Sequence, residues 1–153
     1  MFSKAIAHPF FKELEKGLFS YSGKIDMQEY ADVDVLIRDR SPKALEYAYQ
    51  ELQFISENLQ IFLEAAVADA YSSYEIVKEV SDAGECDLEA DGCELPAIHS
   101  RNEVWEYVQL VDIIVAPKST YPIRLGFRMP WDIEHDFGIY INERKYEYSG
   151  VSV

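Results

Sequence analysis

The stretch that decides the fold runs from residue 123 to residue 142 and reads IRLGFRMPWDIEHDFGIYIN. Both of its ends have an apolar residue at every second position: Ile123, Leu125, Phe127 and Met129, then Phe137, Ile139 and Ile141. This alternation is typical of strands with one buried face. Residues 145–149 predict a further strand close behind. Three strands so closely spaced predict an antiparallel meander.

Upstream, two more strands are predicted, at residues 18–28 and 32–38, and they are followed by a long helical region. Apolar residues recur at helical spacing from Pro42 to about Val80, and Ser41 before the proline is a good helix cap. One straight helix of that length would reach ~58 Å, whereas a chain of this size is ~40 Å wide. We therefore predict a break near residues 56–58.

The remaining segments complete the predicted architecture. Residues 81–96 lose all periodicity and predict an exposed loop, residues 101–106 are ambiguous, and residues 107–115 predict a central strand with Asp112 as its one charged exception. A chain of 153 residues that is 48% hydrophobic can fill one core, so we expect a single domain, 1–153. The fold class predicted is α+β: an antiparallel β-sheet with a C-terminal meander, one face covered by two helices from the 42–80 region. Too few helices alternate with strands for a doubly wound fold.

The charge of the chain is concentrated in its middle. The formal net charge is −14. Residues 44–117 hold sixteen Asp or Glu and two basic residues, a balance of 2 − 16 = −14, and the rest of the chain holds twelve of each sign. Such a field repels nucleic acid and anionic membranes and speeds the encounter with cationic partners. We therefore expect any large partner to be a basic protein.

The expected compartment is the cytoplasm. Residues 1–9 lack the features of a secretion signal, and the longest apolar runs are far shorter than the ~20 residues that span a bilayer. Cys86 and Cys93 lie in the acidic loop with six residues between them. A reducing cytoplasm favours free thiols, while a disulfide across the turn at residues 91–92 stays open as an alternative.

The most specific local motif lies between two of the C-terminal strands and reads Trp131-Asp132-Ile133-Glu134-His135-Asp136-Phe137-Gly138. With its flanking strands, it resembles an uncharacterised bacterial domain family marked by a Trp-Asp-x-Glu-His-Gly turn in a terminal β-meander. That family is often associated with immunity proteins of polymorphic toxin systems. The matching residues are Trp131, Asp132, Glu134 and His135, while Asp136 stands where the family has glycine. The resemblance implies an immunity-type protein and no particular reaction.

The same turn has two other interpretations. Asp132, Glu134 and His135 are three potential ligands within four residues, so a small metal-binding or metal-dependent enzyme domain is the alternative function. In the structural interpretation, which we favour, Trp131 anchors the turn in the core, Asp132 accepts backbone amide hydrogen bonds, and His135 pairs with a carboxylate. We accordingly predict no metal and no cofactor.

Other chemical motifs are incomplete or missing. Residues 87–92 imitate the opening of a calcium loop, but the twelfth position, which should be a bidentate Glu, is Ile98. The sequence has no nucleophile elbow, phosphate-binding loop or dinucleotide motif. No catalytic residue is predicted.

These observations predict a non-enzymatic acidic binding protein, of the immunity type, that neutralises a basic, nuclease-like toxin domain by direct binding. The predicted contact residues are five loop acids, two exposed helix acids and one tyrosine: Glu85, Asp87, Glu89, Asp91, Glu94, Glu57, Glu64 and Tyr47. A homodimer formed through the sheet or the helices is a further possibility. The binding hypothesis requires the anionic middle of the chain to form one continuous surface.

Overall fold

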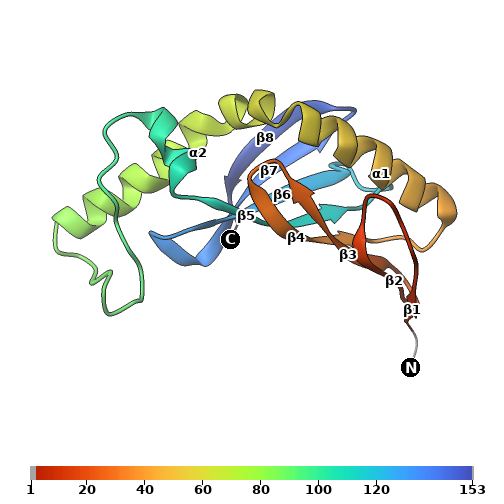
Figure 1. Ribbon diagram of the computed structural model, residues 1–153. Helices are drawn as coiled ribbons and strands as arrows, with labels where there is room; N and C mark the ends of the chain where they lie inside the picture. The colour runs from red at the N-terminus through yellow and green to blue at the C-terminus, as the bar shows by residue number, and fades with distance from the viewer. Residues whose placement is uncertain (1–2, 153) are drawn as a thin grey trace.

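The computed structural model describes residues 3–152, which form one β-sheet with two long helices and one short helix on the same side (Figure 1). The strands are β1 (Lys4–Ala5), β2 (Lys12–Lys16), β3 (Tyr21–Met27), β4 (Tyr30–Ile37), β5 (Gln109–Val115), β6 (Ile123–Met129), β7 (Asp132–Asn142) and β8 (Lys145–Val151). The helices are α1 (Pro42–Glu57), α2 (Leu59–Asp82) and the 3-10 helix η1 (Arg101–Glu106). The predicted α+β class is confirmed.

The eight strands lie in the sheet in the order of the sequence. Neighbouring strands are antiparallel, and the predicted meander is β6–β7–β8. The exception is the central pair, because β4 and β5 are parallel. The sheet is thus mostly antiparallel, as predicted. Its one parallel pair arises because the helical region is a crossover that returns the chain to the sheet in the same direction, as parallel neighbours require.

Local sequence explains the two helices and the break between them. The hydroxyl of Ser41 accepts the backbone N–H of Ala44 at 3.1 Å and so caps α1. At its other end, the side-chain amide of Asn58 donates to the carbonyl of Phe54 at 2.8 Å. This contact competes with the helical ladder, and α2 begins at the next residue. The predicted break near residues 56–58 is confirmed.

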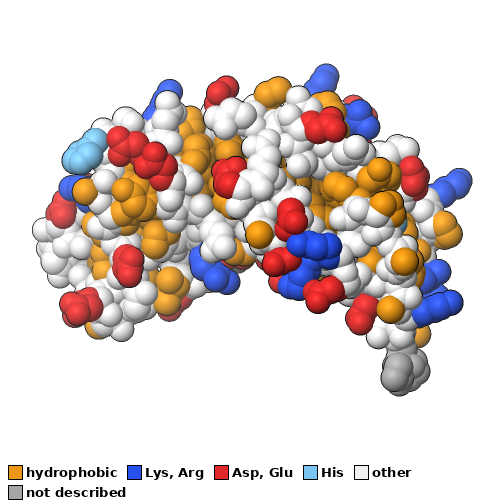
Figure 2. Space-filling view, viewed as in Figure 1, with side chains coloured by type: hydrophobic (Ala, Val, Ile, Leu, Met, Phe, Trp, Pro, Cys, Tyr) orange, Lys and Arg blue, Asp and Glu red, His pale blue; other side chains and the backbone are white. Residues whose placement is uncertain are grey.

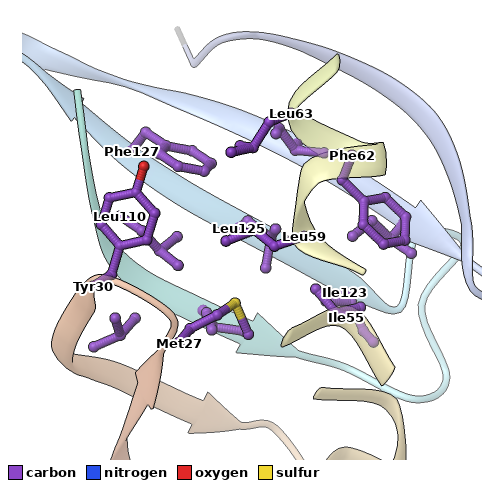
Figure 3. Close-up of a cluster of buried hydrophobic side chains, with 14 of the residues drawn as sticks. Met27, Tyr30, Ile55, Leu59, Phe62, Leu63, Leu110, Ile123, Leu125 and Phe127 are labelled. Atoms are coloured by element: carbon purple, nitrogen blue, oxygen red, sulfur yellow. The ribbon is translucent and has the colours of Figure 1, made fainter. Parts of the chain in front are cut away.

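The core lies between these helices and one face of the sheet. Figure 3 shows Ile55, Leu59, Phe62 and Leu63 from the helices pointing at strand residues that include Met27, Tyr30, Leu110, Ile123, Leu125 and Phe127. All of these side chains are buried. Burial of each large apolar side chain stabilises the fold by about 1.5–3 kcal/mol. The opposite face of the sheet has no helix over it in the described part of the chain (Figure 1).

Among residues 3–152, no helix is long and apolar enough to cross a membrane.

Candidate functional site

A pocket of about 250 Å³ opens where the end of α2, the acidic loop (residues 83–97) and the turn between β6 and β7 meet. We call it the distal pocket. Its lining residues come from these three segments: Ile76, Val77 and Val80 from α2, Cys86, Leu88, Asp91 and Cys93 from the loop, and Trp131, Asp132, Ile133 and Glu134 from the turn and β7. Two motifs that are about forty residues apart in the sequence thus form one site.

Hydrogen bonds to two backbone carbonyls hold the acidic loop in place. The N–H of Glu94 donates to the carbonyl of Pro130 at 2.7 Å, which ties the loop to the β6–β7 turn. The hydroxyl of Tyr74 donates to the carbonyl of Pro96 at 2.6 Å and fixes the end of the loop against α2. Gly92 has φ +76°, a left-handed conformation that glycine adopts without strain. Both cysteines are free thiols.

Trp131 fixes the turn to the core, as the structural interpretation expects. Its side chain is 1% exposed, and its ring meets Tyr74 edge-on at a centroid distance of 5.3 Å. Its indole N–H donates to the hydroxyl of Ser73 at 3.3 Å. The pocket wall therefore shares a residue with the hydrophobic core.

The rest of the motif lies in a strand and not in a loop. The turn consists of Pro130 and Trp131, and β7 already begins at Asp132, which pairs with Met129. The carboxylate of Asp132 accepts the backbone N–H of Glu134 at 3.3 Å and contacts Nδ1 of His135 at 3.0 Å. Both contacts agree with the structural interpretation.

The turn assembles an incomplete set of metal ligands. Asp132 and His135 are in contact, but Glu134 is exposed and its side chain has no hydrogen bond to either of them. Over residues 3–152, no group of three or more His, Cys, Asp or Glu side chains is arranged to hold a metal ion. The segment at residues 87–92, which resembles a calcium loop, forms a turn of its own. There the carboxylate of Asp87 accepts the backbone N–H of Ala90 at 3.2 Å.

Of the five loop acids, Asp91 lines the distal pocket and the other four belong to the same loop. Glu85, Asp87, Glu89, Asp91 and Glu94 are all exposed. Within the described residues, no Lys, Arg or His nitrogen lies within ion-pair distance of any of them. The nearest lysine in the sequence, Lys78, pairs with Asp82 at 2.7 Å. The carboxylates at this end are uncompensated.

Apolar side chains accompany these acids on the surface. Ile76 is 59% exposed and Ile133 is 54% exposed, and both line the pocket. Figure 2 shows carboxylates and hydrophobic side chains next to one another on the lobe at the left, where Figure 1 places the end of α2 and the acidic loop. The site therefore offers an apolar centre with an acidic surround.

The other predicted contact residues lie elsewhere. Glu57 ends α1, and Glu64 lies in the second turn of α2, ~27 Å along the helix from its last residue, Asp82. Tyr47 is partly buried against the core, and burial raises the pKa of its hydroxyl. These three residues are remote from the distal pocket.

Two acids along the helices have polar partners from the C-terminal strands and their connecting turn. Along the helices, Glu51 pairs with Arg144 of the β7–β8 turn at 2.6 Å, and Asp69 accepts the hydroxyl of Ser149 at 2.7 Å. Packing of the helices against the C-terminal strands neutralises or occupies these acids. Glu57 and Glu64 are exposed and form no ion pair among residues 3–152, so one continuous anionic surface stays a prediction.

A second cluster of polar side chains, which the sequence did not predict, lies on the face of the sheet that no described helix covers. We call it the open-face cluster, and it consists of Asp112, Tyr121, Arg124, Tyr140 and Tyr148. The guanidinium of Arg124 donates to the hydroxyl of Tyr140 at 3.2 Å and to Asp112 at 3.4 Å. Tyr140 and Tyr148 stack at a centroid distance of 4.3 Å, with Tyr121 edge-on to Tyr148 at 4.9 Å.

Two glycines make room for this cluster. A Cβ on Gly126 would lie 2.0 Å from a carboxylate oxygen of Asp112, and a Cβ on Gly138 would lie 2.9 Å from Nε of Arg124. Desolvation raises the pKa of Asp112, while Arg124 opposes that shift. Two features of the sequence pointed toward this cluster: the single charged residue of β5, and the glycines inside β6 and β7. Neither feature showed that these residues lie next to one another in the sheet.

Comparison with known proteins identifies a family but no activity. The model of a domain family, described as a domain of unknown function (DUF6985), matches residues 10–151. Neither the curated proteins nor the solved structures contain a match to the chain.

Proposed function

The chain belongs to DUF6985, a family of domains of unknown function, and we propose that it is a non-enzymatic binding protein, of the immunity type, that neutralises a basic toxin domain by covering its surface. The observation that carries this proposal is the distal pocket, where exposed apolar side chains lie beside loop carboxylates that have no cationic partner among residues 3–152.

The proposed mechanism has two stages. The uncompensated acids first attract a cationic surface over distances of about a Debye length, which raises the rate of association. Contact then removes water from the apolar centre of the site, and the carboxylates pair with lysine or arginine of the partner. A nuclease holds nucleic acid with such cations, so an acidic protein that occupies them blocks substrate binding.

The size of the pocket favours a protein partner over a small substrate. Sites for small molecules enclose about 300–1,000 Å³, and the distal pocket, at about 250 Å³, is smaller than that range. Protein interfaces instead need shallow apolar centres with a polar rim.

The alternative function, a metal-binding or metal-dependent enzyme domain that uses the turn, has less support because Asp132 and His135 meet without a third ligand. Elemental analysis of protein purified without a histidine tag separates the two functions. The binding proposal expects no stoichiometric metal. Stoichiometric metal that is lost in Glu134→Ala and His135→Ala would favour the alternative.

The binding proposal is tested by co-purification from the native host and by co-expression with the products of neighbouring genes, followed by affinity measurements at rising salt. We expect affinity to fall with salt. We also expect the variant Glu85→Gln, Asp87→Asn, Glu89→Gln, Asp91→Asn, Glu94→Gln to bind more weakly and to lose most of that salt dependence.

The matched control is the double variant Glu57→Gln, Glu64→Gln, which removes one acid from α1 and one from α2, both remote from the pocket. This control should bind almost as tightly as the wild type. A loop variant with unchanged affinity and unchanged salt dependence would refute the proposal, even if a partner had been found.

A further inference from the structure

We propose that the distal pocket receives one large apolar side chain of the partner, and that this side chain is flanked by lysine or arginine. The inference rests on the proposed function and goes beyond it, because it specifies the sequence chemistry of the segment that binds.

The pocket has walls suited to an aliphatic or aromatic side chain. Val80 lies on the α2 side, Leu88 on the loop side and the buried ring of Trp131 on the sheet side. A volume of about 250 Å³ accommodates a single side chain with its adjoining backbone and is too small for a drug-sized ligand. Binding energy at protein interfaces is concentrated in such anchor side chains, which fill preformed pockets near the centre of the contact.

Two isoleucines extend the apolar surface beyond the pocket mouth. Ile76 and Ile133 are more than half exposed, and both line the pocket. An exposed isoleucine alone means little: Ile61 is 61% exposed on the same helix and does not line the distal pocket. The pairing of two exposed isoleucines with a hollow between loop, helix and turn is what indicates an occupant.

Charge selects which apolar segment fits. Asp91 and Glu134 line the pocket itself, and the other acids of the same loop have no cationic partners in the described chain. An anchor flanked by acids would be repelled, and so would a second copy of this chain, since each copy carries −14. Lysine or arginine on both sides of the anchor supplies the missing partners.

The test uses two synthetic peptides that differ in one residue. Each has a central residue between two pairs of arginine and lysine, with both ends blocked; the centre is leucine in the first peptide and serine in the second. Binding is followed by NMR titration of the Ile76 and Ile133 methyl groups at low salt. We expect the leucine peptide to bind about tenfold more tightly or better, the ratio expected from burial of one leucine.

Three variants localise the effect. Ile76→Ser with Ile133→Ser should abolish the preference for leucine, whereas Ile61→Ser should keep it. The loop variant with five amides should weaken both peptides alike. Because all of these changes are at exposed positions, the amide spectrum of each variant should retain the dispersion of the wild type.

The outcomes separate the inference from the proposed function. If both peptides bind with the same affinity and the same salt dependence, the anchor is wrong while acidic recognition stands. If the leucine preference persists in the Ile76 and Ile133 variant, the pocket is not its origin. If neither peptide perturbs the methyl groups at millimolar concentration, both proposals fail at this site.

Discussion

The distal pocket and the open-face cluster both contain carboxylates, but of these two regions only the cluster has, within residues 3–152, a carboxylate that faces an arginine side chain. In the open-face cluster, Asp112 faces Arg124, and elsewhere on that face Lys24 pairs with Asp34 at 2.7 Å. Around the distal pocket the loop acids have no such partners in the described chain. The difference shows that charge on this protein has two roles. Asp112 and Asp34 on the strands form ion pairs with arginine or lysine of the adjacent strand. The carboxylates of the acidic loop form none within the described chain and are exposed to a binding partner.

The cause lies in backbone geometry. Strand register places Asp112 opposite Gly126, one step along the strands from Arg124, so the arginine side chain can lie across the glycine toward the carboxylate. The loop meets the start of β7, whose pocket-lining residues Asp132, Ile133 and Glu134 supply no Lys or Arg. Hydrogen bonds to the carbonyls of Pro130 and Pro96 hold the loop in place.

The largest effect is expected where the distal pocket joins the core. Trp131→Ala should destabilise the protein by about 3–5 kcal/mol, because it leaves a large cavity and removes the indole hydrogen bond to Ser73. Urea denaturation measures the change. Ile133→Ala, at the exposed rim of the same pocket, should cost far less. Equal losses of unfolding free energy in the two variants would contradict the assignment of Trp131 to the core and of Ile133 to the exposed edge of the pocket.

The next effect probes the floor of the open-face cluster. Gly126→Ala should destabilise the protein by about 1–3 kcal/mol, because the added methyl collides with the carboxylate of Asp112. Gly150→Ala is the matched control, since a Cβ there has nothing within 4 Å. Thermal unfolding should show a clear loss for the first and almost none for the second. Asp112→Ala should recover part of the loss caused by Gly126→Ala.

A smaller effect distinguishes the acids of the two regions. The loop variant with five amides should change the free energy of unfolding by no more than about 0.5 kcal/mol, and should stabilise the protein at low salt by relieving like-charge repulsion. Asp112→Ala should instead destabilise it, because Arg124 loses its carboxylate partner. Denaturation at two salt concentrations compares them. A large loss in the loop variant would mean that these acids stabilise the fold.

The smallest effect is a difference in pH dependence. Desolvation raises the pKa of Asp112, so the folded state binds more protons than the unfolded state between 3.8 and the raised value. Its contribution to stability therefore falls as pH rises through that interval. Lys12 lowers the pKa of Asp26 through a hydrogen bond, so the contribution of Asp26 rises with pH and is lost as pH falls below 3.8.

Denaturation from pH 2 to 6 on Asp112→Asn and Asp26→Asn checks these signs. Relative to wild type, the Asp112 variant should gain stability as pH rises and the Asp26 variant should lose it. Parallel curves would refute the assignment of opposite environments to the two carboxylates.

Much of the local structure could be predicted from the sequence. Alternating apolar residues located β6 and β7, and the Ser41-Pro42 start located α1. The break at Asn58 followed from length alone. Of the site, the exposed loop acids and the anchoring role of Trp131 were both anticipated. These features depend on neighbours within a few residues, so the sequence pattern contains them.

Other features depended on which distant segments meet. Alternation shows that residues 109–115 form a strand, but not that this strand runs parallel to β4. The sequence shows that Glu51 and Glu85 are both acids, but only packing pairs the first with Arg144 and leaves the second free. In the same way, only the fold brings the loop and the Trp131 turn together around one pocket. Periodicity records the preferences of each segment, whereas contacts between segments are selected by the burial of the whole core.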